Sequence, residues 1–305
     1  MLPRPDEEVQ DQGLGFDLTT MSRRGLLRAL GLGGVTLGLA ACGAASSAST
    51  ATTSSSSSTS SSSSSSSTGT TASDAADVTT EIPDETAGPY PGDGSNGPDV
   101  LESSGVVRSD LRSSFAGMNG TAKGVPMTLT LMLTDLANGG APYAGAAVYV
   151  WHADREGRYS LYSDGVTDQD HLRGVQVADS AGRVSFTSIF PACYDGRWPH
   201  IHVEVYPDVA DVTDAGNAVA TSQVALPQAT CEQVYATAGY EASVANLARV
   251  SLDSDGVFGD DGGVHELGTV TGSVTSGLAV SLAVPVDTRT TPSGGGMAGG
   301  PPASR

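Results

Sequence analysis

The 305-residue chain carries a formal net charge of −19, with 34 acidic and 15 basic residues. Binding to nucleic acid requires a basic face, so this charge excludes nucleic acid as an expected partner. An acidic balance instead fits a solvated extracellular surface. The length would allow two domains, but the N-terminal part has the composition of an export signal and a linker.

The first segment is interpreted as a signal peptide, residues 1–41. Arg23 and Arg24 form a twin-arginine pattern. The apolar run at 29–41 that follows is shorter than the roughly 20 residues needed to span a membrane. It ends in Leu39-Ala40-Ala41-Cys42, which resembles a bacterial lipobox and implies lipid attachment to Cys42. The alternative is an ordinary cleavage site with an incidental cysteine.

We therefore expect an exported lipoprotein on the outer face of the bacterial cytoplasmic membrane, whose only membrane contact is the lipid on Cys42. Residues 42–79 are rich in serine and threonine and predict a disordered tether. Residues 289–305 are rich in glycine and proline and predict a disordered tail. The roughly 200 residues between them, 80–288, suffice for one domain with a buried core.

Short apolar-periodic runs within 80–288 alternate with clusters of Gly, Pro, Asn and Asp, a pattern that predicts an all-β sandwich. One short helix is expected from Cys231 to about Leu247, with Val234, Ala238 and Val244 on one stripe. Strands are predicted at 125–133, 146–151, 183–189, 201–206, 218–226, 269–274 and 278–284.

Two cysteines remain once Cys42 is assigned to lipid. An even number of cysteines outside the cytoplasm favours a disulfide between Cys193 and Cys231. Closing a loop of about 40 residues would stabilise the fold by roughly 4 kcal/mol in the chain-entropy model. The alternative is a pair of buried free thiols.

His200 and His202 are one residue apart in a predicted strand, so both side chains lie on the same face. Two imidazoles on one face can bind a metal ion. Taken alone, such a pair is more often structural than catalytic. A zinc hydrolase built on it would need a carboxylate ligand and a general base, and Glu204 lies on the same strand face.

Four motifs, in the same order along the chain, resemble those of intradiol ring-cleavage dioxygenases. The likeness is greatest to the secreted branch related to the protocatechuate and catechol dioxygenases, and it covers roughly residues 80–286. The motifs are Glu-x-x-Gly-Pro-Tyr at 85–90, Trp-His-x-Asp-x-x-Gly-x-Tyr-Ser at 151–160, Arg-Gly-x-Gln-x-x-Asp-x-x-Gly at 173–182, and the segment 189–202 that ends in the histidine pair.

This resemblance implies a β-sandwich with long loops and a non-haem ferric ion, Fe(3+), held by two tyrosinates and two histidines. Carried over residue by residue, the ligands are Tyr159, Tyr194, His200 and His202. A phenol with a pKa near 10 ligates as phenolate only where the metal stabilises the anion. Ferric iron is a hard acid that suits anionic oxygen.

The implied reaction is cleavage of a catechol-type ring by O2 between the two hydroxyl-bearing carbons, giving a cis,cis-muconate-type product. Tyr194 would leave the metal and take up a substrate proton. Arg197 would stabilise charge that develops on the ring. Gln223 resembles the glutamine that the family places near the metal, although its interval from His202 is longer than usual in the family.

The rival interpretation is a lipid-tethered β-sandwich binding module whose metal site is structural or lost. On the dioxygenase interpretation, plain or substituted catechols, hydroxyquinols and larger catecholic fragments of plant polymers are all open as substrates. Protocatechuate would need a partner for its carboxylate, and Lys123 is the only lysine of the chain. The sequence specifies no oligomeric state.

Overall fold

The computed structural model describes residues 80–292. The predicted signal peptide, Cys42, the tether and residues 293–305 of the predicted tail lie outside the described residues. The division into segments therefore stays a prediction. Within residues 80–292, no helix combines the length and the apolar character needed to cross a bilayer.

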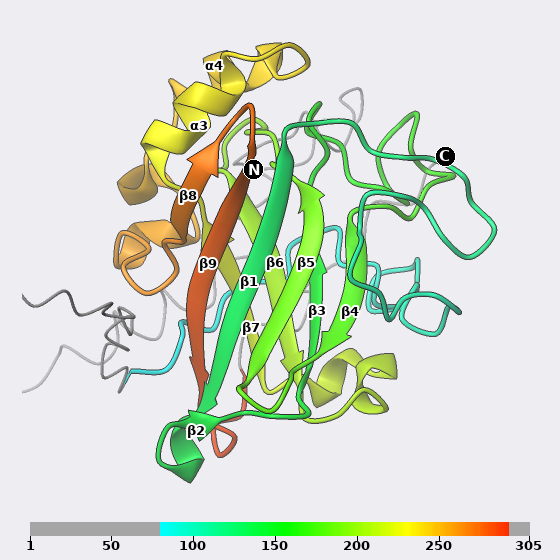
Figure 1. Cartoon of the computed structure of the whole chain (residues 1–305), viewed down its shortest axis with the longest axis vertical. Coiled ribbons are helices and arrows are strands. Elements are labelled where there is room, and N and C mark those ends of the chain that lie inside the picture. The colour runs from blue at the N-terminus through cyan, green and yellow to red at the C-terminus, as the bar shows by residue number, and fades with distance from the viewer. Residues whose placement is uncertain (1–79, 293–305) are drawn as a thin grey trace, which may run out of the picture. The chain divides into compact units, whose positions relative to one another are not determined.

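Two β-sheets pack face to face, as Figure 1 shows. The five-stranded sheet has the order β2-β1-β9-β8, and β5 also pairs with β1. Strands β1 and β9 run parallel, whereas the other pairs of this sheet are antiparallel. Its members are β1 (Pro126–Asp135), β2 (Ala141–Pro142), β5 (Arg183–Ile189), β8 (Thr269–Ser273) and β9 (Gly277–Val286).

The second sheet has four antiparallel strands in the order β4-β3-β6-β7. Its members are β4 (Arg173–Val177), β3 (Ala147–Trp151), β6 (His200–Tyr206) and β7 (Ala220–Ala225). The β-sandwich prediction is thus confirmed. Short 3-10 helices occupy the connections at Leu136–Asn138, Asp211–Thr213, Ala215–Asn217, Leu252–Ser254 and Phe258–Asp260.

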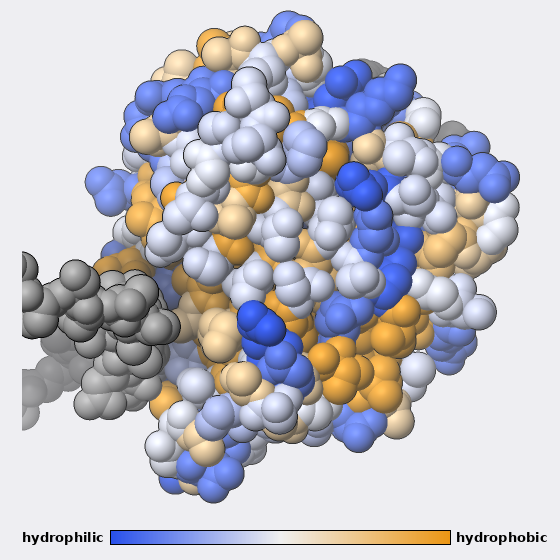
Figure 2. Space-filling model, viewed as in Figure 1, coloured by the Kyte–Doolittle hydropathy of each residue, from blue (hydrophilic) through white to orange (hydrophobic). Residues whose placement is uncertain are grey.

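The main core lies between the two sheets. Leu129 and Leu131 of β1 face Val148 and Val150 of β3 in one cluster of buried residues. Thr128 and Thr130, which alternate with these leucines on β1, are half-buried and point outward. This alternation follows from the period of two in a strand, and Figure 2 shows this face as pale, weakly polar surface mixed with apolar and charged patches. A sheet made mainly of antiparallel pairs, as this one is, commonly leaves one face in solvent.

The outer face of the four-stranded sheet is covered differently. Tyr149 and Trp151 of β3 point away from the main core and form a second buried cluster with Tyr159 and Tyr206. Long loops, rather than another sheet, cover this face. Polar side chains can therefore be buried here against backbone groups of the loops, and this is the face that carries the two histidines of β6.

The single helix predicted after β7 is wrong. The segment forms two helices, α3 (Gln228–Tyr235) and α4 (Glu241–Leu247). Gly239 adopts a left-handed φ of +96° between them, a conformation that ends a helix and that glycine adopts without strain. Val234 is buried, but Val244 is 55% exposed, so the predicted stripe does not exist.

The predicted disulfide is also not formed. Cys193 and Cys231 are both buried free thiols. The Cys193 thiol donates to the carbonyl of Arg197 at 3.4 Å, and the Cys231 thiol lies 3.8 Å from the carbonyl of Leu226. Burial raises the pKa of Cys193 to about 12, which keeps this thiol protonated and inert.

A buried carboxyl group lies beside the edge strand β7. Glu266 is fully buried, and its Oε1 accepts a hydrogen bond from Ser222 Oγ at 3.3 Å. Its Oε2 has no hydrogen-bond partner. Burial, followed by the nearby charges of Glu85 and Asp261, raises the pKa of Glu266 to about 9. The folded protein therefore holds this side chain protonated at neutral pH.

Replacing Glu266 with glutamine should change how stability depends on pH. The unfolded chain releases the Glu266 proton near pH 4.5, whereas the folded chain holds it to about pH 9. The stabilisation from this proton is complete below the lower pKa and is lost as pH rises through the higher one. As pH rises from 4.5 to about 9, the free energy of unfolding of the wild type should therefore fall relative to that of Glu266→Gln. The difference should be up to about 1.4 kcal/mol per pH unit.

Urea unfolding at pH 5, 7 and 9 measures this difference. Glu102→Gln is the matched control, because Glu102 is exposed and its substitution should leave the pH profile unchanged. Parallel profiles for the wild type and Glu266→Gln would contradict the expectation.

Candidate metal centre

The four predicted ligands come from three parts of the chain and meet on the loop-covered face of the four-stranded sheet. His200 and His202 lie at the start of β6, and both are buried. Tyr194 comes from the loop that leads into β6. Tyr159 comes from the loop between β3 and β4 and is 2% exposed.

The side-chain ends of these four residues converge on one point. His200 Nε2 lies 3.1 Å from His202 Nε2, 3.3 Å from Tyr194 Oη and 3.5 Å from Tyr159 Oη. The tyrosine rings approach edge to face, with centroids 5.9 Å apart. The structure therefore brings together all four residues that the motifs singled out, although their role as ligands stays a prediction.

A tight turn positions Tyr159. Asp154 Oδ1 accepts a hydrogen bond from the backbone N–H of Arg158, and Oδ2 accepts one from Arg158 Nε, both at 2.9 Å. Gly157 has a φ of +88°, and a Cβ at this position would lie 3.3 Å from Tyr194 Cβ. The Asp and Gly of the sequence motif thus shape the turn that brings Tyr159 up against Tyr194.

Arg173 joins the loop of Tyr159 to the segment that precedes β1. Its Nη1 donates to the carbonyls of Tyr90 and Pro91 at 2.7 and 2.8 Å. Its Nε and Nη2 donate to Ser160 Oγ and O at 3.0 and 2.9 Å. Tyr90 in turn stacks on Tyr159 with ring centroids 4.8 Å apart. The buried guanidinium therefore fixes both segments that hold the Tyr159 ring in place.

Both histidines are oriented by neighbours and are neutral. His200 Nδ1 donates to the carbonyl of Trp198 at 2.5 Å, which leaves the lone pair on Nε2. His202 stacks on Trp151, its partner across the strands, with centroids 4.7 Å apart. Burial and then the charge of Arg197 lower the pKa of His200 to about 3. Burial and His200 lower the pKa of His202.

These groups fit a trivalent, oxygen-seeking cation. A metal ligand must present a lone pair, and His200 presents one on Nε2 within 3.5 Å of three other donor atoms. Within residues 80–292, no group of three or more His, Cys, Asp or Glu side chains is placed to hold a metal. Binding would therefore depend on the two phenol oxygens, and phenolate is the ligand that a ferric ion prefers.

The zinc hydrolase interpretation finds no support in this geometry. Glu204 is buried on the same strand face as the histidines, but its Oε2 accepts a hydrogen bond from Tyr206 Oη at 2.8 Å. Burial, followed by the charge of Asp93, raises the pKa of Glu204 to about 8. The Glu204 carboxyl group is thus engaged with Tyr206 rather than with the two histidines.

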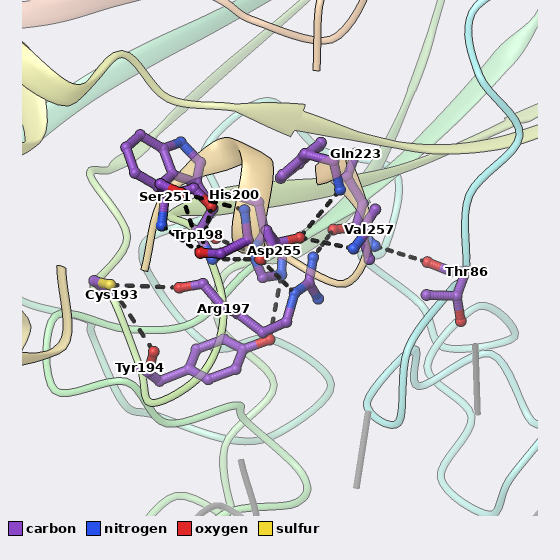
Figure 3. A network of polar contacts seen from close by, with 12 residues as sticks. Thr86, Cys193, Tyr194, Arg197, Trp198, His200, Gln223, Ser251, Asp255 and Val257 are labelled. Carbon is purple, nitrogen blue, oxygen red and sulfur yellow. Dashed lines mark hydrogen bonds and ion pairs between the residues drawn. The ribbon is translucent and has the colours of Figure 1, made fainter. Parts of the chain in front are cut away.

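Arg197 lies beside the cluster in a buried polar network, drawn in Figure 3. Its Nη2 donates to Gln223 Oε1 at 2.6 Å, and its Nε donates to Asp255 Oδ2 at 3.0 Å. Gln223 is paired with His202 across β6 and β7, and its Nε2 donates to the carbonyl of Thr86 at 2.9 Å. Arg197 and Gln223, the two predicted site residues outside the ligand set, therefore lie beside the cluster. Asp255 was not identified from the sequence.

A cavity of about 760 Å³ lies apart from this cluster. It is lined by small and acidic side chains, among them Asp93, Asp99, Asp214 and Thr221. None of the four predicted ligands lines it. The candidate metal centre is therefore defined by the convergence of its side chains rather than by the size of a cavity.

Fold and site together define a β-sandwich protein with two tyrosines and two histidines gathered on the outer face of one sheet. A family model described as "Dioxygenase" matches residues 96–204. A solved intradiol ring-cleavage dioxygenase from Tetranychus urticae superposes with a TM-score of 0.56 at 25% identity, over 69% of this chain and 96% of that one.

Two curated relatives match over shorter segments. Chlorocatechol 1,2-dioxygenase of Rhodococcus opacus is 41% identical over 56 residues, which are 18% of this chain and 22% of the relative. Hydroxyquinol 1,2-dioxygenase of a Rhizobium species is 38% identical over 72 residues, 24% of each chain. The matches thus span under a quarter of the relatives' length. The chain is therefore similar to dioxygenases in part of its sequence and to a solved intradiol ring-cleavage dioxygenase in its fold.

Removing a predicted ligand should weaken iron retention. We expect Tyr159→Phe and His200→Ala to lower ferric affinity at least about tenfold, since even partners of metal ligands contribute that much. Iron content after reconstitution and desalting measures the effect. Tyr143→Phe and His265→Ala are the matched controls, because these residues lie outside the cluster, and both should retain iron. Full iron content in the ligand variants would refute the ligand set.

Proposed function

We propose that this protein is a non-haem ferric-iron dioxygenase that cleaves catechol-type rings between the two hydroxyl-bearing carbons with O2. The product would be of the cis,cis-muconate type. The proposal is carried by the convergence of two phenol oxygens and two imidazole nitrogens. Tyr159 Oη, Tyr194 Oη and His202 Nε2 all lie within 3.5 Å of His200 Nε2. The names of the relatives, a chlorocatechol and a hydroxyquinol 1,2-dioxygenase, support the same substrate class.

The donor set favours ferric iron over a divalent ion. Two phenolates would contribute two negative charges, and the two neutral imidazoles would complete the set without adding charge. Tyr159, Tyr194, His200 and His202 would hold the ferric ion, which would supply Lewis acidity toward a catechol. Hard anionic oxygen ligands stabilise the trivalent state.

The two tyrosines differ in exposure, and this difference supports different roles for them. Tyr159 is buried and stacked on Tyr90, so it is fixed in place. Tyr194 is half-buried. We therefore assign to Tyr194 the role of proton acceptor, in which its Oη would take up a proton from a substrate hydroxyl.

Arg197 provides a fixed positive charge beside the substrate position. Its side chain is 1% exposed, so water screens this charge little. A cation placed in advance stabilises negative charge that develops on the ring without reorganising during the reaction. Gln223 holds one edge of the guanidinium and thereby contributes to its orientation.

The cellular location is proposed from the sequence alone. Arg23, Arg24 and the Leu39–Cys42 segment support export and lipid attachment at Cys42. In a host that processes bacterial lipoproteins, the wild type should fractionate with membranes, and Cys42→Ala should appear in the soluble fraction. Soluble wild-type protein would refute lipid attachment.

The proposed chemistry is tested by colour and by oxygen uptake. Protein reconstituted with ferric iron should be burgundy because of charge transfer from phenolate to iron, and the band should shift when catechol is added under nitrogen. Oxygen uptake with catechol, a chlorocatechol, hydroxyquinol and protocatechuate then identifies the preferred ring. Removal of iron with a chelator should abolish both signals.

The matched control is Tyr143→Phe, which should keep the colour and the activity. A colourless protein that takes up no iron on reconstitution would overturn the proposal. The same result would favour the rival interpretation of a binding module.

A further inference from the structure

We propose that Asp255 is the positioning residue of Arg197, which it holds in the orientation needed to stabilise charge on the substrate. This inference rests on the proposed dioxygenase function and adds to it a residue that no motif of the sequence indicated. Asp255 lies in the connection between α4 and β8, directly after the 3-10 helix Leu252–Ser254.

The carboxylate of Asp255 makes four hydrogen bonds. Oδ2 accepts from Arg197 Nε at 3.0 Å and from the backbone N–H of Trp198 at 2.6 Å. Oδ1 accepts from the backbone N–H groups of Val257 and Phe258 at 2.8 and 3.1 Å. The side chains of Asp255 and Arg197 are 0% and 1% exposed. Both oxygens are thus held in place by backbone groups on two segments.

This arrangement fixes the plane of the guanidinium. Asp255 binds Arg197 at Nε, and Gln223 binds it at Nη2. Because the two contacts are at different nitrogens of a rigid planar group, rotation about the side-chain bonds would break at least one of them. Figure 3 draws the contacts of both partners with the guanidinium. Arg197 is therefore oriented before substrate arrives, which lowers the cost of reaching the transition state.

Asp255 also supplies the countercharge for Arg197. A buried guanidinium without a partner would be strongly unfavourable, more so beside a bound cation. Burial alone would raise the pKa of Asp255, but the charge of Arg197 and the N–H of Trp198 outweigh it and lower the pKa. The carboxylate is therefore ionised at neutral pH. Its four hydrogen bonds are made with Arg197 and with backbone N–H groups.

The segment that carries Asp255 packs directly against the cluster. Phe258 contacts the edge of His200 with ring centroids 6.5 Å apart. Val257 and Phe258 form a small buried cluster with Trp198. Asp255 also accepts from the backbone N–H of Trp198, whose carbonyl accepts from the predicted ligand His200. A substitution of Asp255 could therefore act on iron binding through His200, and a test must separate that effect from an effect on Arg197.

The first test compares Asp255→Asn with Asp253→Asn in the iron-loaded protein. Asp253 is exposed and lies two residues away, so it controls for substitution within the same segment. We expect Asp255→Asn to retain iron and the burgundy band, and to lower kcat about 10- to 100-fold with little change in KM. A variant with wild-type kcat, or one that loses iron while Asp253→Asn does not, would overturn the proposal.

A double-mutant cycle with Arg197→Met separates positioning from a general structural effect. If Asp255 acts through Arg197, adding Asp255→Asn to Arg197→Met should not lower kcat further. If the loss from Asp255→Asn is equally large in both backgrounds, the proposal is wrong. Should Asp255→Asn fail to fold, Asp255→Glu keeps the charge and displaces the carboxylate. It should then lower kcat about tenfold at full iron content, and unchanged kcat would refute the role.

A measurement without iron or substrate keeps this inference distinct from the proposed function. In iron-free protein with 15N-labelled arginine, the Nε–H signal of Arg197 should exchange slowly with solvent in the wild type and rapidly in Asp255→Asn. The Arg197→Met variant assigns the signal. Slow exchange in both proteins would overturn the positioning role. A wild type that shows the slow signal but no oxygen uptake would instead refute the dioxygenase proposal.

Discussion

The period of two in strand β6 is the constraint on which both the fold and the site depend. Ile201, Val203 and Val205 point into the core between the sheets, so His200 and His202 must point to the opposite face. A shift of register by one residue would place the imidazoles in the apolar core and the aliphatic side chains among the loops. The burial that stabilises the sandwich therefore also sets the position of the two nitrogens.

Covering that outer face with loops allows charged side chains to be buried there at little net cost. Arg173 and Arg197 are among the largest fully buried side chains of the described domain. Arg173 is surrounded by backbone carbonyls and hydroxyls, whereas Arg197 has Asp255 and Gln223 as partners. A second packed sheet would offer few such acceptors, since its backbone groups are used in its own ladder. The loops thus provide the polar surroundings that a reactive site needs.

Sequence reasoning identified the parts that depend on local pattern. The seven strands predicted from alternation are present, and the motifs singled out the four side chains that converge. Strand β4 was missed because Arg173, Gly174 and Gln176 obscure its apolar alternation. The single predicted helix failed at Gly239, where tertiary contacts of Tyr240 fix the break: its Oη donates to Phe190 O and accepts from Val125 N. Asp255 is far from Arg197 in the chain, so only the folded structure pairs them.

The two free thiols have a consequence for how this domain reaches its native state. Because Cys193 and Cys231 are buried and unlinked, the fold requires no oxidant to form. The domain can therefore complete its folding in a reducing compartment, where disulfide-dependent proteins cannot. The iron proposed above would then be loaded in that same compartment. The proposed twin-arginine export, which carries folded proteins, would then deliver a finished protein to the outside.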